Sequence, residues 1–320
     1  MAAALGGSPL LPGHAAELPG HTLHAEICRA VLARDGRRLS AEEEAEEEAP
    51  HPELNTMHEE VGTALHWAVA QGAKDAALAL LRCRHFRLVN SPRRSDGSTA
   101  LHIAAAGGLY TVVEALLEHP GFNSLTDVDK DGFTALHGAA YLGHTKCALL
   151  LLAARGFDDA AGVVGAFDVV RPAGHWAEAA AKDYDLRTAL HMAAAAGHAD
   201  IIDLILTLGP PVAATTNATN RVGATALHIA ARGKHTAACG ALLKCPHFTA
   251  VNVRDTRGYT ALHWAAEQST GDICAALLAR EDFAAVETKD LRGRTAMEIA
   301  NHLGHHEVRR LIVQRLGPEF

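Results

Sequence analysis

The sequence has few aromatic residues and no long hydrophobic run. Phe, Trp and Tyr make up 5% of the 320 residues, although hydrophobic residues make up 48%, so the apolar content is mostly Ala and Leu. No stretch of about 18 apolar residues occurs, and we therefore predict no membrane span. The first 13 residues lack a basic region and are interrupted by Gly and Pro, so we also predict no secretory signal.

Positive charge is also scarce. The chain has 29 Lys and Arg against 37 Asp and Glu, which gives a formal net charge of -8 at pH 7. A protein that binds the phosphate backbone of nucleic acid needs a basic surface. We therefore predict no nucleic-acid partner.

Cysteine pairs are missing as well. The six cysteines stand at positions 28, 83, 147, 239, 245 and 274, and none forms a Cys-x-x-Cys pair. A chain of this length does not need disulfides to fold, so we expect buried free thiols. Reduced thiols favour an intracellular protein, cytoplasmic or nuclear.

Catalytic motifs are absent from the sequence. It contains no Gly-x-Ser-x-Gly, no phosphate-binding loop and no dinucleotide-binding glycine pattern after a strand. Histidine is abundant, with 21 residues, but the densest group, His305-His306-Glu307, lacks the spacing of a helical zinc site. We predict that the chain is not an enzyme and binds no metal or cofactor.

One four-residue motif, Thr-Ala-Leu-His, dominates what is present. It begins at Thr63, Thr99, Thr134, Thr188, Thr225 and Thr260, and a seventh copy reads Thr295-Ala296-Met297-Glu298. The intervals between the threonines are 36, 35, 54, 37, 35 and 35 residues. Self-similarity at this period indicates a solenoid of stacked units.

A single repeat reads as turn, helix, turn, helix. Asp131-Gly132 predicts a turn, because Gly adopts positive φ easily. Thr134 then stands where its hydroxyl can cap a short helix over 135–140. Gly143-His144 interrupts that helix, and a Leu-rich second helix follows over 146–153. One unit cannot bury both of its faces, so its neighbours must stack against it, and we predict an all-α solenoid.

These residues resemble the ankyrin repeat proteins, whose pattern is Asp-x-x-Gly, Thr-Pro-Leu-His, Ala-Ala, Gly-His and a Leu-Leu helix. The resemblance covers residues 56–316, as about seven repeats of helix-turn-helix units with turn or hairpin fingers. Ala replaces the usual Pro in every copy, and Leu186 takes the place of the turn Gly in the fourth repeat. In this family the motif histidine ties the turn to neighbouring backbone.

The resemblance implies a non-catalytic protein-protein interaction scaffold that binds a partner protein in a concave groove. The alternative is a regulatory or substrate-recruiting subunit of an enzyme complex, such as a ubiquitin ligase adaptor or a kinase or phosphatase regulator. We expect a monomer.

A phenylalanine recurs five residues after the Leu pair of the second helix. The five copies are Phe86, Phe122, Phe157, Phe248 and Phe283. Regular recurrence in a loop favours packing between neighbouring loops, and a stripe that binds a ligand is the alternative.

Two regions depart from the repeat. Residues 1–55 form an acidic N-terminal segment that we expect to be partly disordered; its block of Ala and Glu over 41–48 is either a solvated helix or a tail. Within it, His21 to Cys28 faintly echoes the motif, and a degenerate capping helix is the other interpretation. The long interval holds a loop insertion near 158–182, which is either a tolerated loop or part of a binding site. Residues 317–320 are a C-terminal tail.

Family positions on the turns and the first helices predict the protein-binding residues. These are Lys130, Phe133, Tyr141, Tyr184, Arg187, Arg221, Arg232, Arg257, Tyr259, Arg292 and Arg294. From the fourth repeat onward the set is rich in Arg and Tyr, which are common at binding hot spots. We therefore expect a partner protein with an acidic segment.

Overall fold

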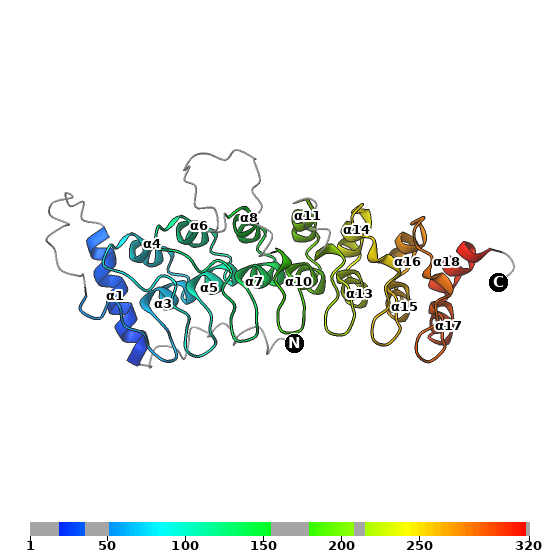
Figure 1. The fold of residues 1–320 in the computed structure, drawn as a ribbon, viewed down its shortest axis with the longest axis horizontal. Coiled ribbons are helices and arrows are strands. Elements are labelled where there is room, and N and C mark those ends of the chain that lie inside the picture. Colours follow the sequence, from blue (N-terminus) through cyan, green and yellow to red (C-terminus); the bar gives the residue numbers. More distant parts are fainter. Residues whose placement is uncertain (1–18, 36–50, 155–178, 208–214, 318–320) are drawn as a thin grey trace. The chain divides into compact units, whose positions relative to one another are not determined.

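The computed structural model describes residues 19–35, 51–154, 179–207 and 215–317, which form pairs of short helices joined by tight turns (Figure 1). The only β geometry in these ranges is one isolated bridge between His58 and Gly62. The prediction of an all-α solenoid is confirmed. The chain divides into two compact units, one of residues 1–139 and 146–178, the other of residues 140–145 and 179–320.

The first unit begins with a single long helix, followed by helix pairs. Its helices are α1 (Pro19–Asp35), α3 (Ala64–Ala70), α4 (Lys74–Arg82), α5 (Ala100–Ala106) and α6 (Tyr110–Glu118), and the unit boundary crosses α7 (Ala135–Leu142) and the start of α8 (Thr145–Ala153). The first helices α3 and α5 contact each other, as do the second helices α4 and α6.

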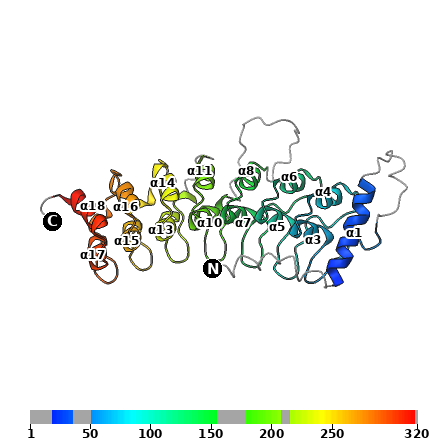
Figure 2. The same ribbon diagram turned by 180° about the vertical axis from the view of Figure 1, so that it is seen from behind.

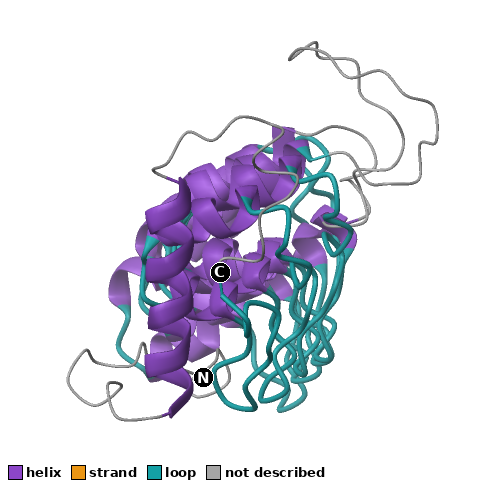
Figure 3. Ribbon diagram, turned by 90° about the vertical axis from the view of Figure 1, so that its left-hand side faces the viewer, coloured by secondary structure: helices purple, strands orange, loops and turns teal. Residues whose placement is uncertain are grey.

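The second unit continues the pairs. It contains α10 (Ala189–Ala196), α11 (Ala199–Thr207), α13 (Ala226–Arg232), α14 (Thr236–Lys244), α15 (Ala261–Glu267), α16 (Gly271–Leu278), α17 (Ala296–His302) and α18 (His306–Leu316), with short 3-10 turns η3 (Ala250–Asn252) and η4 (Ala285–Glu287). The first helices α10, α13, α15 and α17 pack in one row, and α14, α16 and α18 continue the second row from α11. In each unit the long turns lie on one side of the helices (Figure 3).

Helix α1 packs against α3 and α4 of the first repeat (Figure 2). Ile27, Cys28 and Val31 on this helix are buried, and the Cys28 thiol lies 3.9 Å from the carbonyl oxygen of Ala64. The helix therefore covers the apolar face that the first repeat presents at the start of the array. It lies inside the segment for which the sequence led us to expect partial disorder, and it favours the capping-helix interpretation of His21 to Cys28. The acidic block over 41–48 lies outside the described residues.

The motif threonine and histidine act together at each first helix. The backbone N–H of Thr63 donates to Nδ1 of His66 at 3.2 Å, which leaves Nε2 as the protonated nitrogen that donates to the carbonyl of Ser98 at 3.2 Å. The imidazole thus joins its own helix cap to the turn of the next repeat. Equivalent Nε2 bonds reach Phe133 from His102, Ala224 from His191, Tyr259 from His228 and Arg294 from His263. The structural role implied for the motif histidine is confirmed.

Burial lowers the pKa of four of these imidazoles and so favours their neutral form. It lowers the pKa of His66 to about 4, and it also lowers the pKa of His102, His228 and His263. In the last repeat Glu298 stands at the motif position, and its carboxylate accepts the N–H of Thr295 at 2.7 Å. A carboxylate can only accept, so Glu298 keeps the bond to its own helix cap but cannot donate as the motif histidines do.

The recurrent loop phenylalanines are packed inside the fold. Phe86, Phe122, Phe248 and Phe283 are all buried, and Phe157 lies outside the described residues. The packing interpretation is confirmed for those four. Five of the six cysteines are likewise buried free thiols, and Cys83 is half-buried.

An asparagine ladder also joins neighbouring loops, and the sequence analysis missed it. Its members are Asn55, Asn90, Asn217 and Asn252. The amide of Asn252 donates to the carbonyl of Asp282 at 2.8 Å and accepts the N–H of Ala284 at 2.9 Å. Each amide so satisfies both a donor and an acceptor of the next loop, which fixes the loop spacing between repeats.

Candidate interaction surface

Five-residue turns, which we call fingers, precede the first helices. They are finger 3 (129–133), finger 4 (183–187), finger 5 (220–224), finger 6 (255–259) and finger 7 (290–294). In finger 6 the Asp255 carboxylate accepts the N–H groups of Arg257 at 2.8 Å and Tyr259 at 2.9 Å. Asp or Asn makes the same two bonds at the first position of the other four. The tip of each finger is therefore held in one shape by its own first side chain.

Backbone hydrogen bonds set each finger beside the preceding one. In the second unit, the N–H at the second finger position donates to the carbonyl at the third position of the finger before it. These bonds run from Arg221 to Asp185 at 2.8 Å, from Thr256 to Val222 at 2.9 Å and from Leu291 to Arg257 at 3.1 Å. Equivalent positions of fingers 4 to 7 consequently form rows along the second unit.

Two of the predicted binding residues are buried aromatic rings. Phe133 and Tyr259 occupy the fifth finger position and are 4% and 3% exposed. Each ring packs on the motif histidine four residues later, at 5.8 Å between the Phe133 and His137 centroids and 5.3 Å for Tyr259 and His263. The prediction that these two rings are exposed to a partner is wrong, because the fifth position directs its side chain back onto the following helix.

Two of the predicted arginines at this fifth position are engaged within their own finger. Nε of Arg187 lies 2.6 Å from the buried Asp183 carboxylate, and Nη2 of Arg294 lies 2.9 Å from that of Asp290. Although burial opposes it, the hydrogen bonds from Arg294 and Arg292 lower the pKa of Asp290. Part of the expected arginine row is thus neutralised by its own fingers.

The second finger position carries cations that reach back to the preceding finger. Nζ of Lys130 donates to the carbonyl oxygens of Arg94 at 2.8 Å and Ser95 at 2.7 Å. Nη2 of Arg221 donates in the same way to the carbonyl of Tyr184. Both cations remain exposed, so they combine a structural bond with an accessible charge.

The two remaining tyrosines of the predicted set differ in exposure. Tyr184 at the tip of finger 4 is 61% exposed. Tyr141 is half-buried at the end of α7, where its carbonyl accepts Nε2 of His198 at 3.1 Å. Of the two, Tyr184 is the more accessible to a partner.

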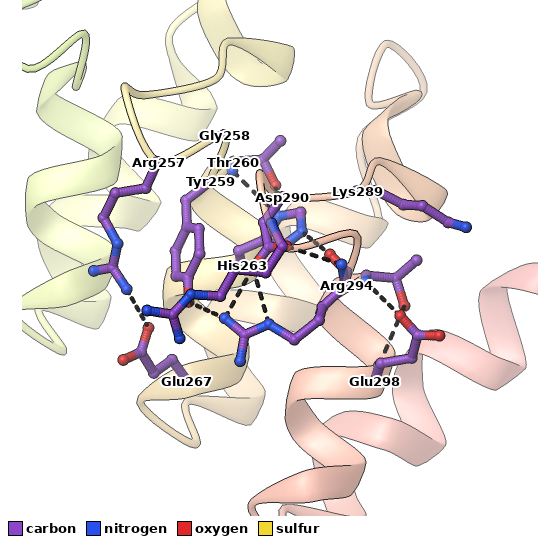
Figure 4. Close-up of polar contacts among 12 residues, drawn as sticks. Arg257, Gly258, Tyr259, Thr260, His263, Glu267, Lys289, Asp290, Arg294 and Glu298 are labelled. Atoms are coloured by element: carbon purple, nitrogen blue, oxygen red, sulfur yellow. Dashed lines mark hydrogen bonds and ion pairs between the residues drawn. The ribbon is translucent and has the colours of Figure 1, made fainter.

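An arginine–aromatic cluster lies where α13, finger 6, α15 and finger 7 meet. Figure 4 shows its members Arg257, Tyr259, Glu267 and Arg294. We define it as Arg232, Arg257, Tyr259, Trp264, Glu267 and Arg294. The Arg257 guanidinium lies 4.2 Å from the Tyr259 ring centroid and 4.7 Å from that of Trp264. Nη2 of Arg294 donates to the Tyr259 hydroxyl at 3.0 Å, and the Arg232 guanidinium lies 5.6 Å from the Trp264 ring. The two rings meet edge to face at 5.0 Å.

The sequence analysis missed Trp264 in this cluster. Its indole N–H donates to the Asp255 carboxylate at 3.0 Å, which locks the ring beneath Arg257. The available signal was the residue after the motif histidine, which is Trp at positions 67 and 264 but Ile at 103 and 229.

Comparison with known proteins identifies the family. A model described as ankyrin repeats (3 copies) matches residues 65–162, 173–255 and 242–320. The chain belongs to the ankyrin repeat family. Ankyrin repeats are protein-protein interaction modules, and the fold is typical of non-catalytic proteins. The resemblance seen in the sequence is confirmed.

Two solved ankyrin repeat domains have a similar fold. The ankyrin repeat domain of Bcl-3, described as a unique member of the IkappaB protein family, is 24% identical, with a TM-score of 0.59 over 78% of this chain and 96% of that one. An ankyrin repeat domain from Acinetobacter baumannii AYE is 25% identical, with a TM-score of 0.52 over 67% of this chain and 96% of that one.

The curated relative is a BTB/POZ domain-containing protein 1 of Schizosaccharomyces pombe, 41% identical over 56 residues. Those residues are 18% of this chain and 4% of the relative, so the match concerns a small part of that protein. Within the described helices of the ankyrin chain, none is long and apolar enough to cross a membrane. Among the same residues, no three His, Cys, Asp or Glu side chains are grouped to hold a metal ion.

The arginines at and beside fingers 5 to 7 differ in how far they are paired with carboxylates. Arg257 is 49% exposed, and its ion pair with Glu267 is long at 4.0 Å. Arg232 and Arg292 are exposed, and neither forms an ion pair with any residue that the structure describes. Burial, and secondarily the Glu267 carboxylate, raises the pKa of Tyr259, so its hydroxyl stays protonated while it accepts from Arg294. Accessible positive charge therefore gathers at Arg232, Arg257 and Arg292.

Proposed function

We propose that the second unit binds a partner protein through an acidic segment of that partner, at the arginine–aromatic cluster and the tips of fingers 5 to 7. The observation that supports this most is the Arg257 guanidinium, which stacks on two buried rings yet stays half exposed. Stacking restricts the guanidinium before any partner arrives, so less conformational entropy is lost when it binds a carboxylate.

Charge complementarity supports an acidic partner. Fingers 5 to 7 contain four arginines and two aspartates, and both aspartates are buried and already hydrogen-bonded within their fingers. A net positive surface on a chain of net charge -8 selects for carboxylates. Guanidinium groups hold carboxylates through two parallel hydrogen bonds, and salt weakens such exposed pairs.

The test is a charge reversal that spares the finger framework. Arg232→Glu with Arg292→Glu changes two exposed arginines that have no described ion pair, whereas reversing Arg294 would place a carboxylate beside Asp290 and disturb finger 7. The matched control is Arg309→Glu with Arg310→Glu, two exposed arginines on α18.

A displayed library of acidic 16-residue peptides with randomised hydrophobic positions serves as the probe, and selected peptides are measured by fluorescence anisotropy at two salt concentrations. We expect the Arg232/Arg292 variant to lose at least about tenfold in affinity, with little change in melting temperature, because exposed charges contribute little to stability. The α18 control should bind like the parent protein. Equal binding by the Arg232/Arg292 variant, or no peptide selected at all, would contradict the proposal.

A further inference from the structure

Leu186 occupies a finger position that otherwise belongs to glycine. Its φ is 60°, in the left-handed region that residues with a side chain rarely adopt. The equivalent fourth position is Gly132, Gly223, Gly258 and Gly293 in fingers 3, 5, 6 and 7, with φ between 70° and 82°. Finger 4 therefore holds a branched apolar side chain in a backbone conformation that disfavours it.

Burial does not account for this residue. Leu186 is 45% exposed, and its neighbour Tyr184 at the same tip is 61% exposed. The hydrogen bond from Arg221 to Asp185 sets finger 5 alongside, where Val222 is 51% exposed. We call Tyr184, Leu186 and Val222 the apolar tip patch.

The register of the fingers places Leu186 toward finger 5. A Cβ added to Gly258 would lie 2.9 Å from the backbone nitrogen of Leu291, and one added to Gly223 would lie 3.5 Å from that of Thr256. The fourth position of a finger thus faces the second residue of the next finger. For Leu186 that residue is Arg221, so the apolar tip patch continues from finger 4 to finger 5.

The charges beside the apolar tip patch differ between its two sides, and this difference would orient a bound segment. On the finger 4 side, the exposed Asp185 carboxylate lies 3.3 Å from Nη2 of Arg187, which also pairs with Asp183, so one cation faces two carboxylates and this side stays net negative. On the finger 5 side, the exposed Arg221 donates to the Tyr184 carbonyl, and the accessible arginines of fingers 6 and 7 follow. A segment lying along this edge would meet apolar side chains first and cations afterwards.

We infer that the apolar tip patch receives one bulky hydrophobic side chain of the acidic segment, and that the carboxylates of that segment continue toward fingers 5 to 7. This inference rests on the proposed function, since it names the hydrophobic anchor of the same partner segment. Exposed residues in strained backbone cluster at binding sites, because stability alone does not favour them. A desolvated apolar centre beside charged groups is the usual arrangement of a binding hot spot.

The decisive variant is Leu186→Gly, because stability and binding should respond in opposite ways. Glycine relieves the left-handed backbone, so the urea midpoint should stay the same or rise. The same change removes the anchor site, so affinity for the selected acidic peptides should fall about tenfold or more. Ser269→Gly is the matched control, because Ser269 is uncharged and also has positive φ, 60°, but lies in the turn between α15 and α16. It should relieve similar strain and leave peptide affinity unchanged.

A second arm changes the peptide. The hydrophobic residue that selection fixes in the peptide is replaced by Ala, and both peptides are measured on both proteins. We expect the Ala peptide to bind the parent protein about tenfold more weakly and to lose nothing further on Leu186→Gly, as a directly contacting pair should behave.

The outcomes separate the two proposals. If Leu186→Gly binds the original peptide as tightly as the parent does, or if its urea midpoint falls, the inference is wrong, because Leu186 is then either irrelevant to binding or held by internal packing. The proposed function would survive that result as long as Arg232→Glu with Arg292→Glu still weakens binding by at least about tenfold. If the arginine reversal has no effect, the proposed function fails and the inference fails with it.

Discussion

Finger 4 and finger 6 share one backbone and present opposite surfaces. In both, the first-position aspartate accepts two backbone N–H groups, and the same backbone bond joins each to its neighbour. Finger 4 exposes Tyr184 and Leu186 at its tip, whereas finger 6 exposes Arg257. The comparison teaches that the buried first position and the motif histidine fix the framework, which leaves the tip positions free to vary in chemistry.

The largest expected effect is a loss of stability when the buried motif Leu beneath finger 4 or finger 6 is truncated. Comparing the two losses tests whether the helices below the two fingers pack alike. Leu190 and Leu262 follow fingers 4 and 6 at the same motif position and are 1% and 0% exposed. Leu190→Ala and Leu262→Ala should each lower the free energy of unfolding by about 2–5 kcal/mol, because each leaves a cavity in a packed interface. Urea denaturation measures both, with the 46% exposed Leu303→Ala as control. A much smaller loss at one site would mean that the two repeats are not packed alike.

Acid should weaken the histidine bonds that hold the fingers. The folded-state pKa of His66 is lowered from 6.5 to about 4, so the unfolded chain binds the proton more readily. The full contribution is therefore present above pH 6.5 and is lost as the pH falls toward 4. For His66 alone the loss should reach about 3 kcal/mol.

This pH dependence is measured by urea denaturation at several pH values between 7.5 and 4. His66→Gln should give a shallower fall in stability over that range, and His302→Ala, which changes an exposed histidine, should leave the slope unchanged. An identical slope in the parent and His66→Gln would show that His66 is not the titrating group.

A smaller effect is expected from the side chain that shapes the finger itself. Asp255→Ala removes the acceptor of two N–H groups and of the Trp264 indole, and should cost about 2 kcal/mol. Asp255→Asn should cost less, because Asn220 already makes both backbone bonds in finger 5. Thermal melting compares the two variants. Equal destabilisation by Ala and Asn would argue that charge, not the acceptor geometry, holds the finger.

The smallest effect is expected where cations reach back to the preceding finger. Lys130→Ala and Arg221→Ala each remove hydrogen bonds to carbonyl oxygens from an exposed side chain. Each should lower the unfolding free energy by less than about 1 kcal/mol, since water replaces such donors easily. A loss well above that in either variant, measured by urea denaturation, would mean that the finger row depends on these cations.

The sequence was sufficient to predict the repeat architecture because the pattern that carries it is local and periodic. The spacing of the Thr-Ala-Leu-His motif predicted the repeat and the helix that Thr caps, whereas the role of the motif histidine was implied by the resemblance to ankyrin repeat proteins. The site was harder to predict. Arg187 and Arg294 fit a list of exposed arginines by register, yet each is paired with an aspartate four residues earlier. Whether a finger side chain turns outward or back onto its helix depends on packing, which spacing does not encode.

Phe133, Tyr259 and Trp264 illustrate the same limit. All three are large rings near the fingers, and their burial follows from contacts with the motif histidine or with a buried carboxylate. The sequence analysis placed the first two on the surface and overlooked the third. A position-by-position comparison of the repeats would have singled out Trp264, but its contact with Arg257 of finger 6 is known only from the fold.

Helix α1 has a practical consequence for work with fragments of this protein. The motif-based boundary at residue 56 falls after that helix. A fragment that starts there would expose to solvent the apolar side chains of α3 and α4 that α1 covers. Such a fragment is expected to aggregate or to melt at a lower temperature than one that begins before Pro19. Anyone trimming the chain for crystallisation or display should therefore treat Ile27 and Val31 as part of the first repeat.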